Sequence, residues 1–264
     1  MAQIQELRRR IKSTRGWTLR RELHGLARSY RLFLGNAREL EGFLRAHSEP
    51  PEAVLELWRE DRRAEFERFL DEVDRLLHNF VAAAATLADH TRNVWKDHQP
   101  ADASVREEYV SRTKETFVAP LPQFVKGLRN YTLHRRLPIA QGQLSWERGM
   151  AAPLSRIAIV RDDLLKWRKW TAGAREFLAA APAEIDIAEL VERYTRTVVE
   201  FNDWLGEAFV GAHLDAFDEL TQLEEASGSF ITTLRAGLRV PATTLADAVR
   251  RRLASLRAAD PSRR

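Results

Sequence analysis

Residues 66–94 read FERFLDEVDRLLHNFVAAAATLADHTRNV and carry apolar or small side chains at alternating intervals of four and three residues. The repeating positions are Phe66, Leu70, Val73, Leu77, Phe80, Ala84, Leu87, Thr91 and Val94. A mean spacing of about 3.5 residues places them along one side of an α-helix, as in helical bundles and coiled coils. The sequence therefore predicts one long helix over residues 52–97 that packs against other helices.

Similar patterns occur on both sides of this stretch. Asp186 is a suitable N-cap for a second long helix over residues 187–225. An N-terminal helical extension covers residues 1–47, with Thr18 as the N-cap of its longer helix. The apolar positions of that helix are Leu19, Leu23, Leu26, Tyr30, Phe33, Ala37, Leu40 and Leu44. Shorter helices are predicted at 3–14, at 105–118 after Ser104, from Asp162 or Asp163 to Pro182, at 230–238 and at 245–256.

In one segment, the spacing of the apolar residues is typical of β-strands rather than of helices. Residues 143–148 alternate in polarity, and Ile157-Ala158-Ile159-Val160 is apolar and rich in β-branched side chains. Gly149 and Pro153 lie between them, which favours a small β-hairpin over residues 143–161. The predicted fold class is all-α: a helical bundle built on two long helices, with an inserted hairpin. A single domain covers residues 1–256, and residues 257–264 form a basic, disordered tail.

Composition excludes several classes of chemistry. The 264 residues include no cysteine, which removes thiol nucleophiles, disulfides and cysteine metal sites. The sequence contains no Walker A, GxGxxG, GxSxG or HExxH motif, so neither a metal nor a cofactor is expected. The charged N-terminus and the lack of a long apolar run predict a cytoplasmic protein without a membrane partner.

The net charge of +4 conceals an uneven distribution. Residues 1–31 carry a net +7 and residues 235–264 a net +6, so residues 32–234 carry −9. Basic ends are typical of proteins that bind nucleic acid or an acidic partner, and also of solvated helix faces.

Residues 124–138 combine the side chains that RNA cleavage requires. On a helix, Asn130 lies one turn before His134, and the long side chain of Arg129 can reach the same volume. A histidine transfers protons near neutral pH, and an arginine stabilises the charge that develops on a phosphorane. Further phosphate contacts are expected from Lys126, Arg135 and Arg136.

The pattern Arg129-Asn130-x-x-x-His134 resembles the motif of the HEPN superfamily, whose members are all-helical and in many cases metal-independent ribonucleases of toxin, phage-defence and RNA-processing systems. The resemblance implies that Arg129 and His134 are the catalytic pair and that Asn130 supports them. It also implies RNA as the substrate, a homodimer with two motifs at a shared cleft and, for a toxin, a neutralising antitoxin partner.

Two further sets of residues are candidates near this site. Asn79 belongs to a polar stripe on the helix 52–97, and His78 is adjacent to it. If residues 124–137 pack against this helix, His78 or Asn79 could line the same cleft. Trp167 and Trp170 are expected to pack against the hairpin. The alternative function is a non-catalytic helical interaction module that binds a protein or nucleic-acid partner, because a fold class does not by itself imply chemistry.

Overall fold

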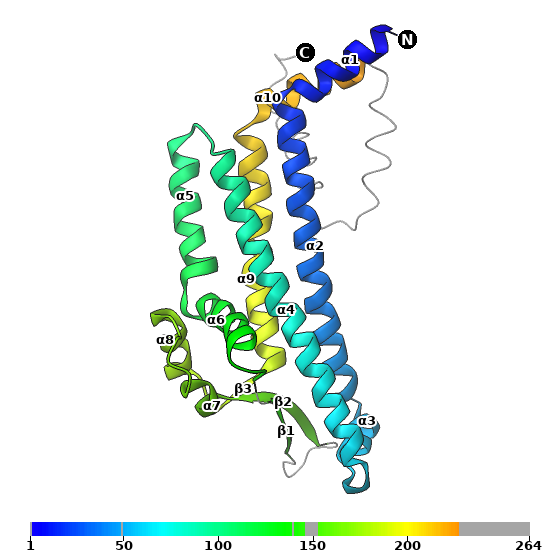
Figure 1. Cartoon of the computed structure of the whole chain (residues 1–264), viewed down its shortest axis with the longest axis vertical. Coiled ribbons are helices and arrows are strands. Elements are labelled where there is room, and N and C mark those ends of the chain that lie inside the picture. Colours follow the sequence, from blue (N-terminus) through cyan, green and yellow to red (C-terminus); the bar gives the residue numbers. More distant parts are fainter. Residues whose placement is uncertain (1, 49, 139, 146–152, 227–264) are drawn as a thin grey trace. The chain divides into compact units, whose positions relative to one another are not determined.

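A computed structural model of the chain describes all residues except 1, 49, 139, 146–152 and 227–264 (Figure 1). The helices are α1 (Ala2–Ser13), α2 (Arg15–Ser48), α3 (Pro51–Leu57), α4 (Arg63–Asp97), α5 (Ala103–Thr113), α6 (Pro120–His134), α7 (Arg161–Leu165), α8 (Ala172–Ala180), α9 (Ile187–Gly211) and α10 (Leu214–Ala226). A 3-10 turn, η1 (Glu60–Arg62), precedes α4, and a π-helical segment, η2 (Lys114–Val118), follows α5. The predicted all-α class with a small inserted hairpin is confirmed.

The apolar pattern of α2 is confirmed, because all eight of its predicted positions are buried. The helix begins earlier than predicted, at Arg15, and the hydroxyl of Thr14 accepts a hydrogen bond from the backbone N–H of Trp17 at 3.1 Å. Thr18 is exposed inside the helix. Thr14 therefore caps α2 in the place predicted for Thr18.

The predicted helix 52–97 is interrupted. α3 ends at Leu57, η1 follows, and α4 begins at Arg63. Trp58 ends α3, and its indole N–H donates to the hydroxyl of Ser155 at 3.0 Å, while its ring packs on Phe66. The break coincides with a tertiary contact between this turn and the hairpin. Within α4, the predicted positions from Val73 to Val94 are buried, whereas Phe66 and Leu70 are half-buried.

The hairpin consists of β1 (Ala140–Ser145) and β2 (Leu154–Val160), which are antiparallel, with Ala140 opposite Ile159. A third antiparallel strand, β3 (Glu184–Asp186), pairs with the end of β2, and the sequence did not predict it. Gly142 lets β1 approach α4, since a Cβ there would lie 2.6 Å from Cζ of Phe66.

Two other segments that were predicted as single helices each form two helices in the structure. The helix expected from Asp162 to Pro182 is α7 and α8, separated by residues 166–171, and Thr171 caps α8. Asp162 and Asp163 lie in the first turn of α7. The helix expected over residues 187–225 is α9 and α10, and its predicted cap is confirmed, since Asp186 Oδ1 accepts from the N–H of Glu189 at 3.0 Å. Asp102, rather than Ser104, caps α5.

The chain divides into two compact units. Unit 1 comprises residues 1–28, 90–113 and 199 onward, and unit 2 comprises residues 29–89 and 114–198. In unit 1, the ring of Trp95 stacks on Tyr109 at 3.7 Å, and Tyr109 also contacts Phe201.

In unit 2, α2, α4 and α9 contribute the contacting rings of Phe33, Phe80 and Tyr194. The helices predicted at 230–238 and 245–256, and the tail 257–264, lie outside the described residues.

Candidate functional site

The candidate site lies on α6, which belongs to unit 2. Pro120 and Pro122 both lie in the first turn of α6, where a missing backbone N–H costs nothing. The helix buries a side that includes Phe124, Val125 and Leu128, which leaves Lys126 exposed on the opposite side.

α6 is held against α8 and the α7–α8 connection by aromatic side chains. Phe124 stacks on Phe177, with ring centroids 4.5 Å apart, and Tyr131 is parallel to Trp170 at 5.7 Å. Gly127 allows this approach, because a Cβ there would lie 2.7 Å from ring atoms of Trp170. Trp167 and Trp170 were expected to pack against the hairpin, but the rings that they contact belong to α6 and to each other.

Arg129 and Asn130 are in direct contact. An Nη1 atom of Arg129 donates a hydrogen bond to Oδ1 of Asn130 at 3.2 Å, and both side chains are half-buried. Arg129 forms no ion pair with any described carboxylate. Its guanidinium therefore lies beside the amide and keeps donors available for an external anion.

His134 is the last residue of α6 and is exposed. It lies four residues after Asn130, hence one turn further along the helix. The predicted order of Arg129, Asn130 and His134 thus occurs on a continuous helix, with the imidazole accessible to solvent.

The expected phosphate-binding residues differ in their surroundings. Lys126 and Arg135 are exposed. Arg136 is partly engaged, because its Nε donates to the hydroxyl of Tyr131 at 3.0 Å and its Nη2 lies 3.8 Å from Asp163. Lys166 also pairs with Asp163, and its hydrogen bond holds the pKa of that carboxyl below the usual range. Arg135 is therefore more available to an anion than Arg136.

His78 and Asn79 lie on α4, between the buried residues Leu77 and Phe80, and both are half-buried. Among the described residues, neither forms a hydrogen bond with Arg129, Asn130 or His134. Their place beside the candidate site stays a prediction.

A metal centre was not predicted, and within the described ranges no group of three or more histidine and carboxylate side chains could hold a metal ion. In the same ranges, no helix has both the length and the apolar character needed to cross a membrane.

Sequence reasoning missed the residues next to this site on the α7–α8 connection. Residues 166–170 read KWRKW, and Arg168 and Lys169 are exposed between two tryptophans that contact Tyr131. The alternation of basic and aromatic residues was visible in the sequence, but its position beside α6 depends on the tertiary packing.

No protein-family model matches the chain, and no curated protein or solved structure is significantly similar to it. The function is therefore argued from the site itself.

Proposed function

We propose that this chain is a HEPN-like, metal-independent endoribonuclease whose active site includes Arg129, Asn130 and His134. The observation that carries the proposal is the hydrogen bond between Arg129 and Asn130 on the accessible side of α6, one turn before an exposed histidine. Arg129 stabilises the scissile phosphate, His134 transfers a proton, and Asn130 orients the guanidinium.

The reaction is an attack of the ribose 2′-oxygen on the adjacent phosphorus. The 2′-hydroxyl loses its proton, the bond from phosphorus to the 5′-oxygen breaks, and the leaving 5′-oxygen receives a proton. The products are a 2′,3′-cyclic phosphate and a 5′-hydroxyl. An imidazole can serve as the base or the acid near neutral pH, and a guanidinium stabilises the negative charge of the transition state.

This reaction needs one group to remove a proton and another to deliver one. The motif supplies a single histidine, so the proposal includes a homodimer in which the second motif provides the other group. If the chain acts as a toxin or in phage defence, a neutralising protein partner covers this surface.

The test is cleavage of a labelled single-stranded RNA in the presence of EDTA. We expect wild-type protein to cleave, and Arg129→Ala and His134→Gln to lose activity by about 100-fold or more. Arg193→Ala is a matched control, because Arg193 is an exposed arginine on α9 that pairs with Glu189 across one helical turn. Absence of cleavage by the wild type, or equal cleavage by all variants, contradicts the proposal.

A second candidate function is a non-catalytic interaction module that binds a nucleic-acid or protein partner. One observation favours it: among the described residues, no second acid or base is hydrogen-bonded to His134. This function predicts salt-dependent binding without cleavage, and binding that is the same for His134→Gln and the wild type.

A further inference from the structure

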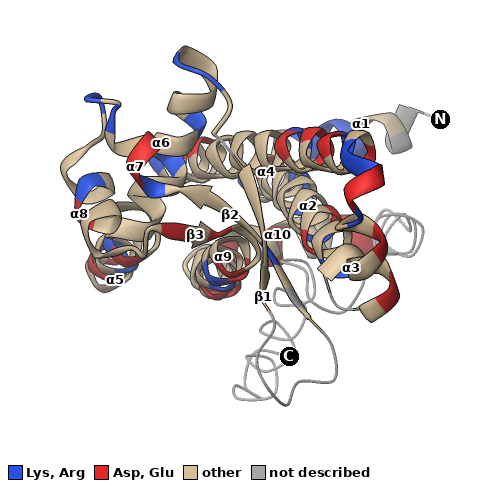
Figure 2. Ribbon diagram, turned by 90° about the horizontal axis from the view of Figure 1, so that it is seen from below, with Lys and Arg blue, Asp and Glu red and all other residues tan. Residues whose placement is uncertain are grey.

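The cations around the end of α6 continue onto the α7–α8 connection. Residues 120–138 contain four basic residues and no carboxylate, and residues 161–170 contain four basic residues and two aspartates. By contrast, residues 32–234 as a whole carry a net −9. The basic positions of α6, α7 and α8 are blue in Figure 2. A local excess of positive charge thus lies within an acidic part of the sequence.

The connection is held firmly against α6. The ring of Trp167 lies 5.5 Å from that of Tyr131, and the indole N–H of Trp170 donates to the carbonyl of Leu164 at 2.7 Å. Trp170 is only 3% exposed, whereas Arg168 and Lys169 are exposed between the two indoles. Tyr131 lies one turn before Arg135, so both exposed cations are presented near the end of α6 on an ordered segment. Such ordering reduces the entropy lost when an anion binds.

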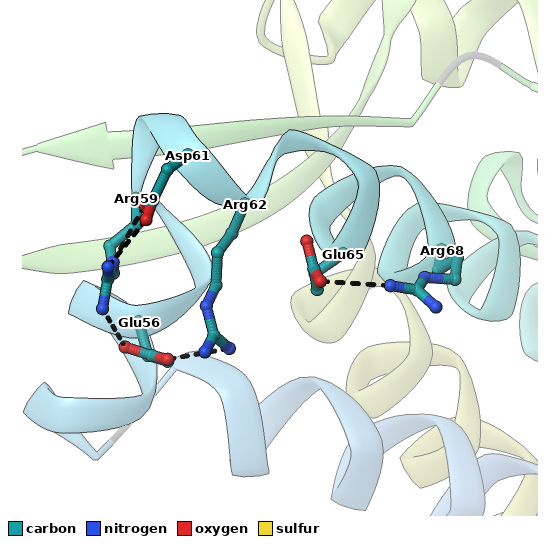
Figure 3. Close-up of polar contacts among 6 residues, drawn as sticks. All are labelled: Glu56, Arg59, Asp61, Arg62, Glu65 and Arg68. Atoms are coloured by element: carbon teal, nitrogen blue, oxygen red, sulfur yellow. Dashed lines mark hydrogen bonds and ion pairs between the residues drawn. The ribbon is translucent and has the colours of Figure 1, made fainter.

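At the α3–α4 turn of unit 2, by contrast, arginines are neutralised within the chain. Figure 3 shows this at the α3–α4 turn. There, Arg59 pairs with Asp61 at 2.7 Å, Arg62 pairs with Glu56 at 2.7 Å, and Arg68 pairs with Glu65 at 3.2 Å.

The surface formed by α6 and the α7–α8 connection is different. Within the described part of the chain, no carboxylate pairs with Lys126, Arg135, Arg168 or Lys169, and Asp163 is already shared by Arg136 and Lys166. These four cations are available for anions from outside the chain.

We propose that Arg168 and Lys169, together with Arg135, bind the sugar-phosphate backbone of a single-stranded RNA beside the candidate cleavage site. The inference rests on the proposed function in one respect: the bound strand is the one to be cleaved. Arg168 and Lys169 do not pair with the same residues of a second chain, because like charges repel each other. A flexible polyanion carries a charge on each nucleotide and can contact cations on two elements at once.

The test is fluorescence anisotropy with a labelled 12-nucleotide 2′-O-methyl oligouridylate, which lacks the attacking hydroxyl and cannot be cleaved. We expect the double variant Arg168→Gln/Lys169→Gln to bind roughly 10- to 100-fold more weakly at 50 mM salt. The slope of log affinity against log salt should decrease by about 1.4, because two phosphate contacts are lost. Arg59→Gln/Arg62→Gln is the matched control, since it removes two cations that already have partners, and it should bind like the wild type.

Equal affinities for the wild type and both double variants overturn the inference. It is also overturned if the wild type binds a polyglutamate peptide but not the oligonucleotide, since the partner is then an acidic protein. If the wild type binds the oligonucleotide through Arg168 and Lys169 but does not cleave unmodified RNA in EDTA, the ribonuclease proposal fails while the binding surface is supported. Circular dichroism of each variant verifies that it is folded.

Discussion

At Gly142, strand β1 lies very close to aromatic side chains of the α3–α4 region. An added Cβ would lie 2.6 Å from Phe66 and 2.8 Å from Trp58, and both rings belong to packed side chains. Overpacking of this kind costs about 1–3 kcal/mol. We therefore expect Gly142→Ala to lower the free energy of unfolding, as measured with urea.

Gly35 provides the matched comparison. It is exposed in α2, and nothing lies within 4 Å of a Cβ built at this position. Gly35→Ala should increase the free energy of unfolding by roughly 0.5–1 kcal/mol, because alanine is the better helix former. Equal effects of the two substitutions would contradict the packing argument.

Asp74 is an acidic residue in an unfavourable position on α4. Its Oδ1 atom is buried without a hydrogen-bond partner, and burial, together with the charge of Asp71, raises the pKa of its carboxyl to about 6. Since the folded pKa lies above the unfolded value, ionisation of Asp74 destabilises the fold at neutral pH. This effect decreases as the pH falls from about 6 to 4.

We expect Asp74→Asn to increase the free energy of unfolding at pH 8 by about 1 kcal/mol, a value reduced for solvent screening of a half-buried carboxylate. The gain should be much smaller at pH 4, where the folded carboxyl is protonated and the unfolded one is only partly ionised. Asp71→Asn, at an exposed position one turn earlier, should give a smaller gain. A pH-independent effect of Asp74→Asn would disprove this explanation.

At the scale of elements, Thr171 determines where α8 begins. Its Oγ1 accepts a hydrogen bond from the backbone N–H of Ala174 at 3.3 Å and donates to Oε1 of Gln123 on α6 at 3.0 Å. The same hydroxyl therefore caps α8 and links it to α6, which carries the candidate site.

Thr171→Ala should lower the free energy of unfolding by about 1 kcal/mol through loss of the cap. Thr171→Ser keeps the hydroxyl and should retain most of the stability. Thermal unfolding followed by circular dichroism compares the two variants, and equal melting temperatures would indicate that the cap contributes nothing.

At the scale of the whole molecule, His213 is the residue that joins distant parts of the sequence in unit 1. It lies between α9 and α10 and is 1% exposed. Its Nε2 lies 3.0 Å from the carbonyl of His98, and its Nδ1 lies 3.2 Å from Nη2 of Arg15. A neutral imidazole satisfies both contacts, since Nε2–H donates and Nδ1 accepts.

Burial is the main cause that lowers the pKa of His213, and the charge of Arg15 lowers it further, while the His98 carbonyl and Asp215 oppose the shift. The unfolded state therefore binds a proton more readily, so the free energy of unfolding should fall as the pH decreases below about 6.5. The slope due to this group is at most about 1.4 kcal/mol per pH unit. Urea unfolding between pH 8 and pH 5 should show a shallower decrease for His213→Gln, and identical slopes would refute the assignment.

The sequence predicted much of the fold because the apolar periodicity of α2 and α4 is a local property. A side chain at every third or fourth position faces the same side of a helix whatever the helix packs against. The cap at Asp186 and the strands β1 and β2 were also predicted, because they too depend on patterns among residues close together in the sequence. The end of α3 at Trp58 was not predicted, because the apolar periodicity indicated a continuous helix there. Trp58 contacts Phe66 and also Ser155 on the hairpin, which is distant in the sequence.

The candidate site also depends partly on local sequence patterns and partly on tertiary packing. The spacing of Arg129, Asn130 and His134 on one helix was set by the sequence, since local geometry fixes residues one turn apart. Only the tertiary structure brought Arg168 and Lys169 to this end of α6, because Trp167 and Trp170 pack on Tyr131, more than thirty positions earlier. The sequence by itself determined the helical class and the motif, whereas packing between distant side chains decided where the helices break and which cations lie beside the motif.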